Sequence, residues 1–312
     1  MLRSTLLYLS NQQKVFRFIR RNRLAKRFAD RFVAGETVET ALDAVAALNA
    51  QGIRASLDIL GESVHNEAEA RDAGREYVHL LDRIAERKLD CNVSLKLTAM
   101  GLDVSEDLCV EIVHAVLQRA RDHGSFVRLD MESSDYTERT LRMFYERFYP
   151  VYGNHVGIVL QSYLFRTEQD VARAIGERCR VRLCKGAYKE PPAVAYPDKK
   201  DVDAAYVREM HALMRDGNYP GLATHDEAII AEAKRFAKES GIDASRFEFQ
   251  MLYGVRRDLQ EQIVREGWNM RVYVPFGTQW YPYLMRRLAE RPANLAFMTG
   301  NILKESVRRR KP

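Results

Sequence analysis

The feature that most constrains the fold of this chain is an alternation of short apolar runs with longer helical segments, which continues from residue 53 to the C-terminus. Eight runs have the length and the β-branched or apolar character of buried strands. They cover residues 53–59, 92–97, 126–131, 156–161, 181–184, 222–225, 247–250 and 271–274. Between them, apolar residues recur three or four positions apart, as in Leu108, Ile112 and Val116. This spacing predicts helices that join the eight strands.

Strands joined by helical crossovers run parallel, because each crossover returns the chain to the same end of the sheet. Eight such units predict a closed (βα)8 barrel of the TIM type, and a doubly wound α/β sheet is the alternative. The strand ends favour the barrel. Nearly every run closes on a polar or charged residue, namely Asp58, Lys96, Asp130, Gln161, Arg182 with Lys185, His225, Gln250 and Tyr273. In a barrel these side chains converge at the C-terminal mouth, where such enzymes place their active sites.

The chain has 312 residues, which accommodates this barrel as one domain with short additions at its ends. The expected parts are an N-terminal helical arm (1–45), the barrel (46–303) and a basic C-terminal tail (304–312). Leu24, Phe28 and Phe32 would form the apolar face of the arm, because they are spaced four residues apart.

Positive charge is concentrated at the two ends of the chain. Residues 1–27 contain eight Lys or Arg and no acid, and residues 304–311 contain five basic residues and one acid, although the net charge is only +6. The body between them is therefore acidic, which argues against a nucleic-acid-binding domain. The basic ends are compatible with transient contact to an anionic membrane surface, and solvated helix faces are the simpler explanation.

The sequence also bears on the compartment. No apolar run approaches the roughly 20 residues that cross a bilayer, and polar residues interrupt the apolar N-terminus. We therefore expect no membrane span and no secretory signal. The four cysteines, Cys91, Cys109, Cys179 and Cys184, form no C-x-x-C pair. These features predict a cytoplasmic protein, whose basic ends would meet the inner face of the cell membrane.

Common catalytic motifs are absent from the sequence. It contains no G-x-G-x-x-G, no P-loop, no H-E-x-x-H and no zinc-type Cys or His spacing, so we expect no metal site. After the fifth strand, Arg182 and Lys185 stand beside Gly186 and Ala187. Two cations next to accessible backbone amides suit a phosphate group, which His225 could hold from the other side. A βα turn with an incidental lysine is the alternative.

A pair of adjacent arginines, Arg286 and Arg287, lies on a predicted helix near the C-terminus. Adjacent residues are about 100° apart on a helix, so both can face one ligand only if the helix end points over the site. Two guanidinium groups in one place suit a carboxylate. From composition alone, a solvated basic helix is the simpler interpretation.

Eight segments in succession resemble the signature motifs of the proline dehydrogenase family. They are 94–97 (SLKL), 128–132 (RLDME), 160–163 (LQSY), 182–188 (RLCKGAY), 223–226 (ATHD), 249–252 (FQML), 271–275 (RVYVP) and 283–287 (YLMRR). The resemblance extends from about residue 50 to about residue 300, and the length is similar to that of the bacterial monofunctional form. It implies a distorted (βα)8 barrel that binds FAD, with the last helix over the barrel mouth.

The resemblance also implies an activity: oxidation of L-proline to Δ1-pyrroline-5-carboxylate by hydride transfer to flavin N5, as the first step of proline catabolism, with electrons passed to a membrane quinone. It implies that Asp130 and Arg182 are catalytic-site residues. The residues that would contact FAD are Met131, Gln161, Arg182, Lys185, Gly186, Ala187, Thr224, His225 and Glu290. The residues that would bind proline are Lys96, Leu252, Tyr273, Tyr283, Arg286 and Arg287. Glu62 is expected to pair with Arg287 as a gate.

One residue departs from the family pattern, and two other functions agree with the residues alone. The bifunctional members carry a tryptophan at the position of Lys189, so the resemblance does not define how the adenine is held. Lys96 could be the Schiff-base nucleophile of an aldolase-type barrel, which would require a depressed pKa. The chain could also be a noncatalytic adaptor that binds through its basic ends.

Overall fold

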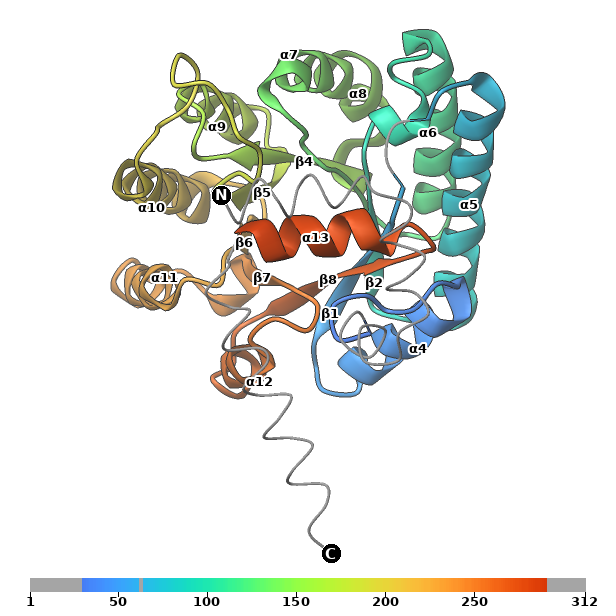
Figure 1. The fold of residues 1–312 in the computed structure, drawn as a ribbon. Helices are drawn as coiled ribbons and strands as arrows, with labels where there is room; N and C mark the ends of the chain where they lie inside the picture. Colours follow the sequence, from blue (N-terminus) through green and yellow to red (C-terminus); the bar gives the residue numbers. More distant parts are fainter. Residues whose placement is uncertain (1–29, 62–63, 291–312) are drawn as a thin grey trace, which may run out of the picture.

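The computed structural model describes residues 30–61 and 64–290, with side chains up to Met285, and its core is a closed parallel barrel (Figure 1). The strands follow one another around the barrel in chain order. They are β1 (Arg54–Ile59), β2 (Cys91–Leu95), β3 (Val127–Leu129), β4 (Val156–Gln161), β5 (Arg180–Cys184), β6 (Gly221–Ala223), β7 (Glu248–Leu252) and β8 (Met270–Phe276). Each coincides with a predicted run, so the barrel is confirmed and the doubly wound sheet is wrong. Pairing of β1 with β8 closes the ring.

Helices surround the barrel, except for the last one, α13. They are α4 (Val38–Asn49), α5 (Glu67–Glu86), α6 (Glu106–Asp122), α7 (Ser134–Met143), α8 (Tyr149–Tyr152), α9 (Thr167–Gly176), α10 (Lys199–Asp216), α11 (Glu227–Glu239), α12 (Arg257–Arg265) and α13 (Trp280–Glu290). Short helical turns occur at Thr98–Met100, Phe144–Phe148, Gly153–His155 and Ala244–Arg246. Helix α5 shows how the sequence builds them: Asn66 caps its first turn, and Tyr77, Leu80 and Ile84 form its buried face.

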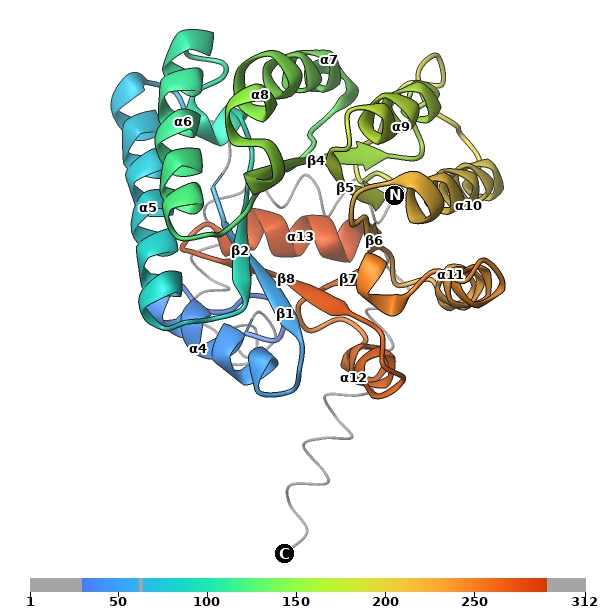
Figure 2. The same cartoon turned by 180° about the vertical axis from the view of Figure 1, so that it is seen from behind.

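Helix α13 lies across the mouth of the barrel instead of beside it, as both views of the fold show (Figures 1 and 2). A small apolar cluster accounts for this position. Trp280, Tyr281 and Leu284 of α13 are buried together with Phe32 and Leu60, which lie before and directly after β1. The expected placement of the last helix is therefore confirmed. Of the predicted apolar face of the arm, only Phe32 is among the described residues.

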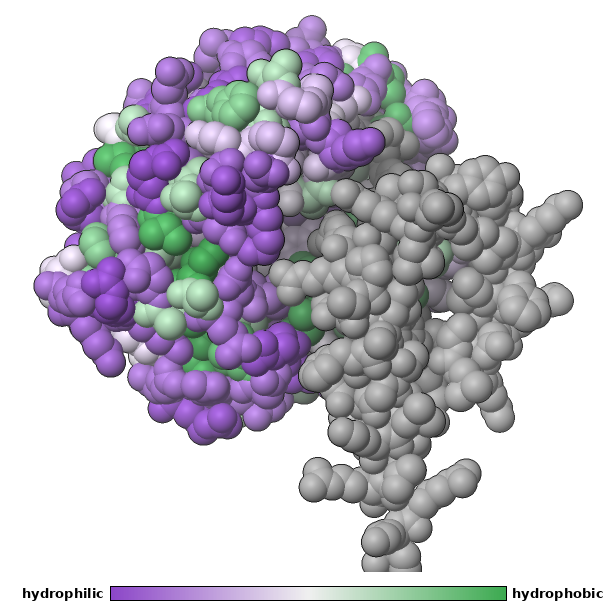
Figure 3. All heavy atoms as spheres, turned by 60° about the vertical axis from the view of Figure 1, so that its left-hand side comes forward, coloured by the Kyte–Doolittle hydropathy of each residue, from purple (hydrophilic) through white to green (hydrophobic). Residues whose placement is uncertain are grey.

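The outer surface over α9 to α11 is largely hydrophilic, with small separate apolar spots (Figure 3). This agrees with helices that bury one face against the barrel, since their polar faces then point to solvent. Within the described ranges, no helix combines the length and apolar character that a membrane span requires.

Candidate active site

A cavity of about 380 Å³ opens at the C-terminal mouth of the barrel, beneath α13. Most residues predicted for the site border it. They are Lys96, Asp130, Met131, Gln161, Arg182, Lys185, Gly186, Ala187, Thr224, His225, Leu252, Tyr273 and Tyr283. Glu62 and the side chains of Arg286, Arg287 and Glu290 lie outside the described part of the chain. The strand ends therefore converge as the barrel predicts, while the gate and the arginine pair stay predictions.

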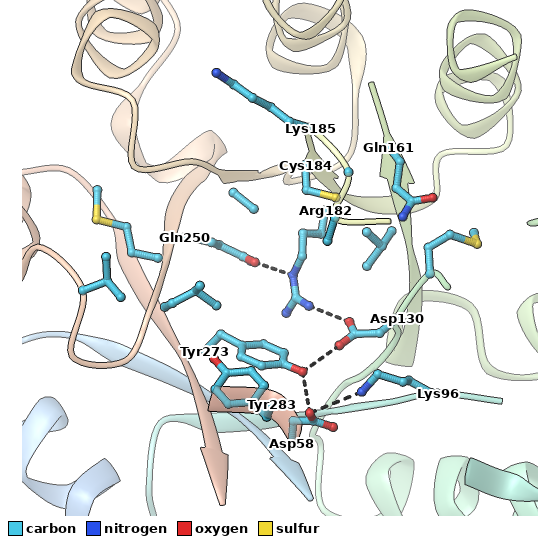
Figure 4. A pocket seen from close by; sticks show the side chains of 18 of the residues that line it. Asp58, Lys96, Asp130, Gln161, Arg182, Cys184, Lys185, Gln250, Tyr273 and Tyr283 are labelled. Carbon is cyan, nitrogen blue, oxygen red and sulfur yellow. Dashed lines mark hydrogen bonds and ion pairs between the residues drawn. The ribbon is translucent and has the colours of Figure 1, made fainter. Parts of the chain in front are cut away.

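One connected set of polar contacts crosses this cavity (Figure 4). Arg182 of β5 donates to Asp130 after β3, with 2.6 Å between Nη1 and Oδ1. The hydroxyl of Tyr273 on β8 lies 3.1 Å from Oδ2 of Asp130 and 2.6 Å from Oδ2 of Asp58 on β1. Lys96, directly after β2, places its Nζ 3.4 Å from the same Asp58 oxygen. The ends of five strands thus hold one polar cluster in fixed positions.

Asp58 has no role in the expectations from the sequence, although it closes the first strand. It is only 1% exposed, and burial raises the pKa of its carboxyl group despite the nearby Lys96. The Tyr273 hydroxyl has a single proton for two neighbouring carboxyl groups, so a proton shared with Asp58 lets both contacts form. The position of Asp58 at the end of a strand is the sequence signal that could have identified it, whereas its raised pKa depends on burial in three dimensions.

Lys96 does not have the properties of a Schiff-base lysine. Burial acts to lower the pKa of its ammonium group, but the carboxyl groups of Asp58 and Asp130 outweigh burial, and the pKa lies above its ordinary value. A Schiff-base nucleophile needs the opposite shift, because only the neutral amine attacks a carbonyl. The aldolase-type alternative is therefore wrong on this point, and Lys96 presents a cation to the cavity.

Arg182 is fixed on three sides. Its Nε donates to Gln250 Oε1 at 2.5 Å, Nη2 donates to Ser94 Oγ at 3.1 Å, and Nη1 bonds Asp130. The guanidinium group also lies over the ring of Tyr273, 5.3 Å from its centroid. Gln250, like Asp58, closes a strand but has no role in the sequence-based expectations. This geometry holds a permanent positive charge at one place in the cavity.

Two cations border the cavity, and each lies beside one carboxyl group. Lys96 is 3.4 Å from Asp58 and Arg182 is 2.6 Å from Asp130. Because both cations line the cavity, a ligand that carries negative charge can contact them there. The cavity therefore suits such a ligand.

Lys185 differs from this cluster in its partners. Its Nζ lies 2.5 Å from Asp203 Oδ1 and 2.9 Å from Asp226 Oδ2, and Figure 4 shows the side chain directed away from Arg182. Lys185 borders the cavity as expected, but two carboxylates neutralise its ammonium group. Neither aspartate was predicted for the site, because nothing in the local sequence marks the approach of α10 to the start of α11.

Gly186 follows Lys185 and has a backbone that only glycine adopts easily, with φ of +111°. A Cβ atom there would lie 2.5 Å from the ring of Tyr163. The chain therefore passes directly over this ring before Ala187 reaches the cavity wall.

Two further residues present defined hydrogen-bonding atoms. Gln161 is 3% exposed, and its buried Oε1 atom has no hydrogen-bond partner among the described residues, so it is an acceptor in need of a donor. His225 accepts a hydrogen bond at Nε2 from the backbone N–H of Leu252 at 3.0 Å. A neutral His225 ring must therefore carry its proton on Nδ1.

Comparison with known proteins shows to which family this barrel belongs. Residues 41–300 match the family model "Proline dehydrogenase". The chain is 42% identical over 307 residues to proline dehydrogenase 1 of Bacillus subtilis, covering 98% of this chain and 100% of that protein. It is 43% identical over 279 residues to proline dehydrogenase of Deinococcus radiodurans, covering 88% and 90%. The chain belongs to the proline dehydrogenase family.

A solved structure of this family has the same barrel. Proline utilization A from Bdellovibrio bacteriovorus, inactivated by N-propargylglycine, is 28% identical to this chain with a TM-score of 0.80. The match covers 86% of this chain but only 33% of that larger one. The resemblance drawn from the eight motifs is thus confirmed, and an oxidoreductase replaces the noncatalytic adaptor.

Proposed function

We propose that this chain catalyses the FAD-dependent oxidation of L-proline to Δ1-pyrroline-5-carboxylate. The observation that carries the proposal is the convergence of Lys96, Arg182, Asp130 and Tyr273 on one cavity, in a member of the proline dehydrogenase family. Proline is a small ring with one carboxylate, and a cavity of about 380 Å³ has room for it beside a flat ring system.

Roles on the substrate side follow from the chemistry of the groups. Lys96 would bind the carboxylate, helped by Arg286 and Arg287 of α13, while Leu252, Tyr273 and Tyr283 would form the walls. Because α13 lies over the mouth, its arginines would close the cavity from above. Holding the carboxylate at one end fixes the ring carbon next to nitrogen at the other.

The residues on the side of the cavity opposite the proposed proline site fit a flavin. Gln161 Oε1, which has no hydrogen-bond partner among the described residues, is an acceptor for a ring N–H, and His225 borders the same cavity. The proposed cofactor residues are Met131, Gln161, Arg182, Lys185, Gly186, Ala187, Thr224, His225 and, on α13, Glu290. FAD would supply the acceptor for the hydride that leaves proline. Arg182 would stabilise negative charge there, and Asp130 would keep Arg182 in place.

Anaerobic mixing with L-proline tests the function. The purified protein should be yellow, and proline should remove the absorbance of the oxidised flavin. Bleaching by another amine or acid, but not by proline, would refute the substrate. Absence of flavin together with trapping of Lys96 by borohydride and a carbonyl compound would instead restore the aldolase.

We also propose that the electrons pass to a membrane quinone, with weak contact between the cytoplasmic protein and anionic lipid. The support is the charge of residues 1–27 and 304–311, which lie outside the described residues. Vesicle cosedimentation tests it: binding should require anionic lipid and disappear at high salt. No binding at low salt would leave these ends as solvated segments.

The proposed gate is an ion pair between Glu62 and Arg287. Its support is sequence position, since Glu62 follows β1 and Arg287 belongs to the helix that lies over the mouth. Glu62→Ala should raise KM for proline without lowering the melting temperature. A normal KM would refute the gate.

A further inference from the structure

The backbone segment most closely tied to the proposed flavin site is the connection from β5 to α10, residues 185–198, called here the cofactor loop. It contains Lys185, Gly186, Ala187 and Tyr188, all of which border the cavity. Apart from a turn at 192–194 and a single bridge between Ala195 and Leu164, this loop has no regular secondary structure. Its conformation must therefore be set by contacts with its neighbours.

Backbone hydrogen bonds tie the two ends of the cofactor loop to the segment after β4. Tyr163 N donates to Lys185 O at 2.9 Å, and Tyr196 N donates to Tyr163 O at 2.8 Å. Further along, Phe165 N donates to Val194 O at 3.0 Å. These bonds hold the loop where it leaves β5 and where it approaches α10. The stretch between them carries the residues that border the cavity.

Glu190 ties down this middle stretch through its carboxylate. The backbone N–H of Ser134 donates to Oε1 at 2.9 Å, the Ser134 hydroxyl donates to Oε2, and the hydroxyl of Tyr163 lies 3.1 Å from Oε1. Ser134 is the first residue of α7, and its N-cap residue Ser133 makes no side-chain capping bond. Glu190 therefore supplies, from another loop, the anionic cap that this helix lacks.

Glu190 and its partners belong to the three loops that provide most of the proposed flavin contacts. Ser134 follows β3, three residues after Met131, and Tyr163 follows β4, two residues after Gln161. Glu190 itself lies four residues after Gly186. One carboxylate thus joins the loops after β3, β4 and β5. No substrate-side residue described above lies on these three loops.

We propose that Glu190 is a positioning residue, which sets the spacing of these three loops for the flavin. The inference rests on the proposed function, because it concerns the same cofactor. Loss of the carboxylate would release the middle of the cofactor loop from α7 and from Tyr163, so the flavin contacts would have to be reordered on binding. The cost should appear in flavin affinity and not in proline affinity.

The experiment compares Glu190→Gln with the wild type in titrations of the flavin-free protein with FAD. Gln keeps the size of the side chain but loses its charge and one acceptor, so we expect the Kd for FAD to rise about tenfold. Glu190→Asp should recover part of the affinity. In FAD-saturated protein, KM for proline should stay within about twofold, because the substrate side is unchanged.

Two matched variants separate positioning from general destabilisation. Tyr163→Phe removes one of the three donors, and its effect on the Kd should be less than additive with Glu190→Gln, since both break the same contact. Glu168→Gln removes an acid from the first turn of the neighbouring helix α9, whose ion partner is Arg208 of α10, and should leave the Kd unchanged. An equal rise in the Kd for Glu168→Gln would overturn the proposal.

Limited trypsin digestion of the flavin-free protein reports on the loop directly, because Lys185 and Lys189 are cleavage sites within it. Faster cleavage there in Glu190→Gln, together with weaker FAD binding, is the expected result. An unchanged Kd for FAD would overturn the positioning role, whether or not cleavage accelerates. If the wild type itself binds no FAD, the proposed function fails and not this inference alone.

Discussion

Two layers of charged side chains fill the inside of the barrel, and they are held in different ways. The lower layer consists of Arg128, Glu248 and Arg271, each at most 6% exposed. Arg271 donates to Glu248 Oε1 and to a backbone carbonyl, both at 2.7 Å. Arg128 donates to two backbone carbonyls at 3.0 and 2.7 Å. This layer lies away from the mouth cavity, which none of its residues borders.

The upper layer consists of Asp58, Lys96, Asp130, Arg182 and Tyr273. Its members contact one another through their side chains and border the cavity. Asp130, directly after β3, lies two residues beyond Arg128, and Tyr273 of β8 lies two residues beyond Arg271. The two layers face the barrel interior together because alternate residues of a strand face the same way. The difference teaches where chemistry can occur. The arginines of the lower layer donate to backbone carbonyls and keep these partners, whereas charged side chains of the upper layer face the cavity and can exchange a partner for a ligand.

The largest expected effect is on the lower layer. Arg271→Met removes the cation that bonds Glu248 and leaves only Arg54, 3.8 Å away, as an ion partner among the described residues, so it should cost about 3 kcal/mol of unfolding free energy. Urea denaturation measures the loss. Arg215→Met is the control, because its pair with Asp216 is exposed and worth at most about 1 kcal/mol. If the two variants lost the same small amount, the lower layer would not be the structural one.

The two layers should respond to pH with opposite signs. Burial acts to raise the pKa of Glu248, but Arg271 outweighs it and lowers the pKa from 4.5 to about 2. A depressed pKa contributes stability above pH 4.5 that is lost as pH falls toward 2, amounting to about 3 kcal/mol at most. The pKa of Asp58 is raised, so its contribution is present at low pH and lost as pH rises.

The opposite pH dependences can be measured by comparing the unfolding free energy of the wild type with that of a variant in which the carboxyl group is replaced by an amide. The advantage of wild type over Glu248→Gln should shrink as pH falls from 5 toward 2. The advantage over Asp58→Asn should instead grow as pH falls. Parallel pH profiles for the two variants would contradict the assignment of opposite shifts.

A smaller effect on stability is expected in the upper layer, where Lys96 should matter more for proline binding than for folding. Lys96→Met removes a carboxylate contact worth roughly 1.5 to 3 kcal/mol, so KM for proline should rise about 10- to 100-fold. Unfolding free energy should change by less than about 1 kcal/mol, because Asp58 can take up a proton. Steady-state kinetics and urea denaturation of the same preparation test both halves. Lys238→Met, on the exposed side of α11, is the control.

Sequence pattern was enough to predict the barrel and much of the cavity wall, because both follow from local rules. The change between strand and helix period defined eight units, and a parallel barrel brings strand ends together at one mouth. Asp130 and Arg182 meet at 2.6 Å for this reason. The position of α13 came from resemblance, since its cause is the apolar cluster around Trp280 and Phe32, which are far apart in the sequence.

What local pattern did not predict are the partners of the charged groups. Lys185 is neutralised by Asp203 and Asp226, which belong to other elements. The raised pKa of Asp58 depends on burial, which no short sequence window contains. Glu190 likewise meets Ser134 from 56 residues away. Strand-end position therefore identifies which residues reach a site, and tertiary contacts decide their charge.

The smallest predicted effect concerns Gln250, which joins the two layers. Its Oε1 accepts from Arg182 Nε at 2.5 Å, and its Nε2 donates to Glu248 Oε1 at 2.7 Å. Gln250→Met keeps the volume but leaves both partners short of one hydrogen bond, so stability should fall by about 1 to 2 kcal/mol. Because Arg182 keeps Asp130 and Ser94, turnover with proline should fall only a few-fold.

A double-mutant cycle decides whether Gln250 couples the stability of the two layers. If it does, the stability effects of Gln250→Met and Arg271→Met should be non-additive by at least about 0.5 kcal/mol, since both act on Glu248. Gln262→Met, an exposed glutamine of α12 that bonds Glu266, should be additive with Arg271→Met. Additivity in both cycles would mean that the layers are independent. Gln250 would then fill space between two ion clusters whose roles are already separate.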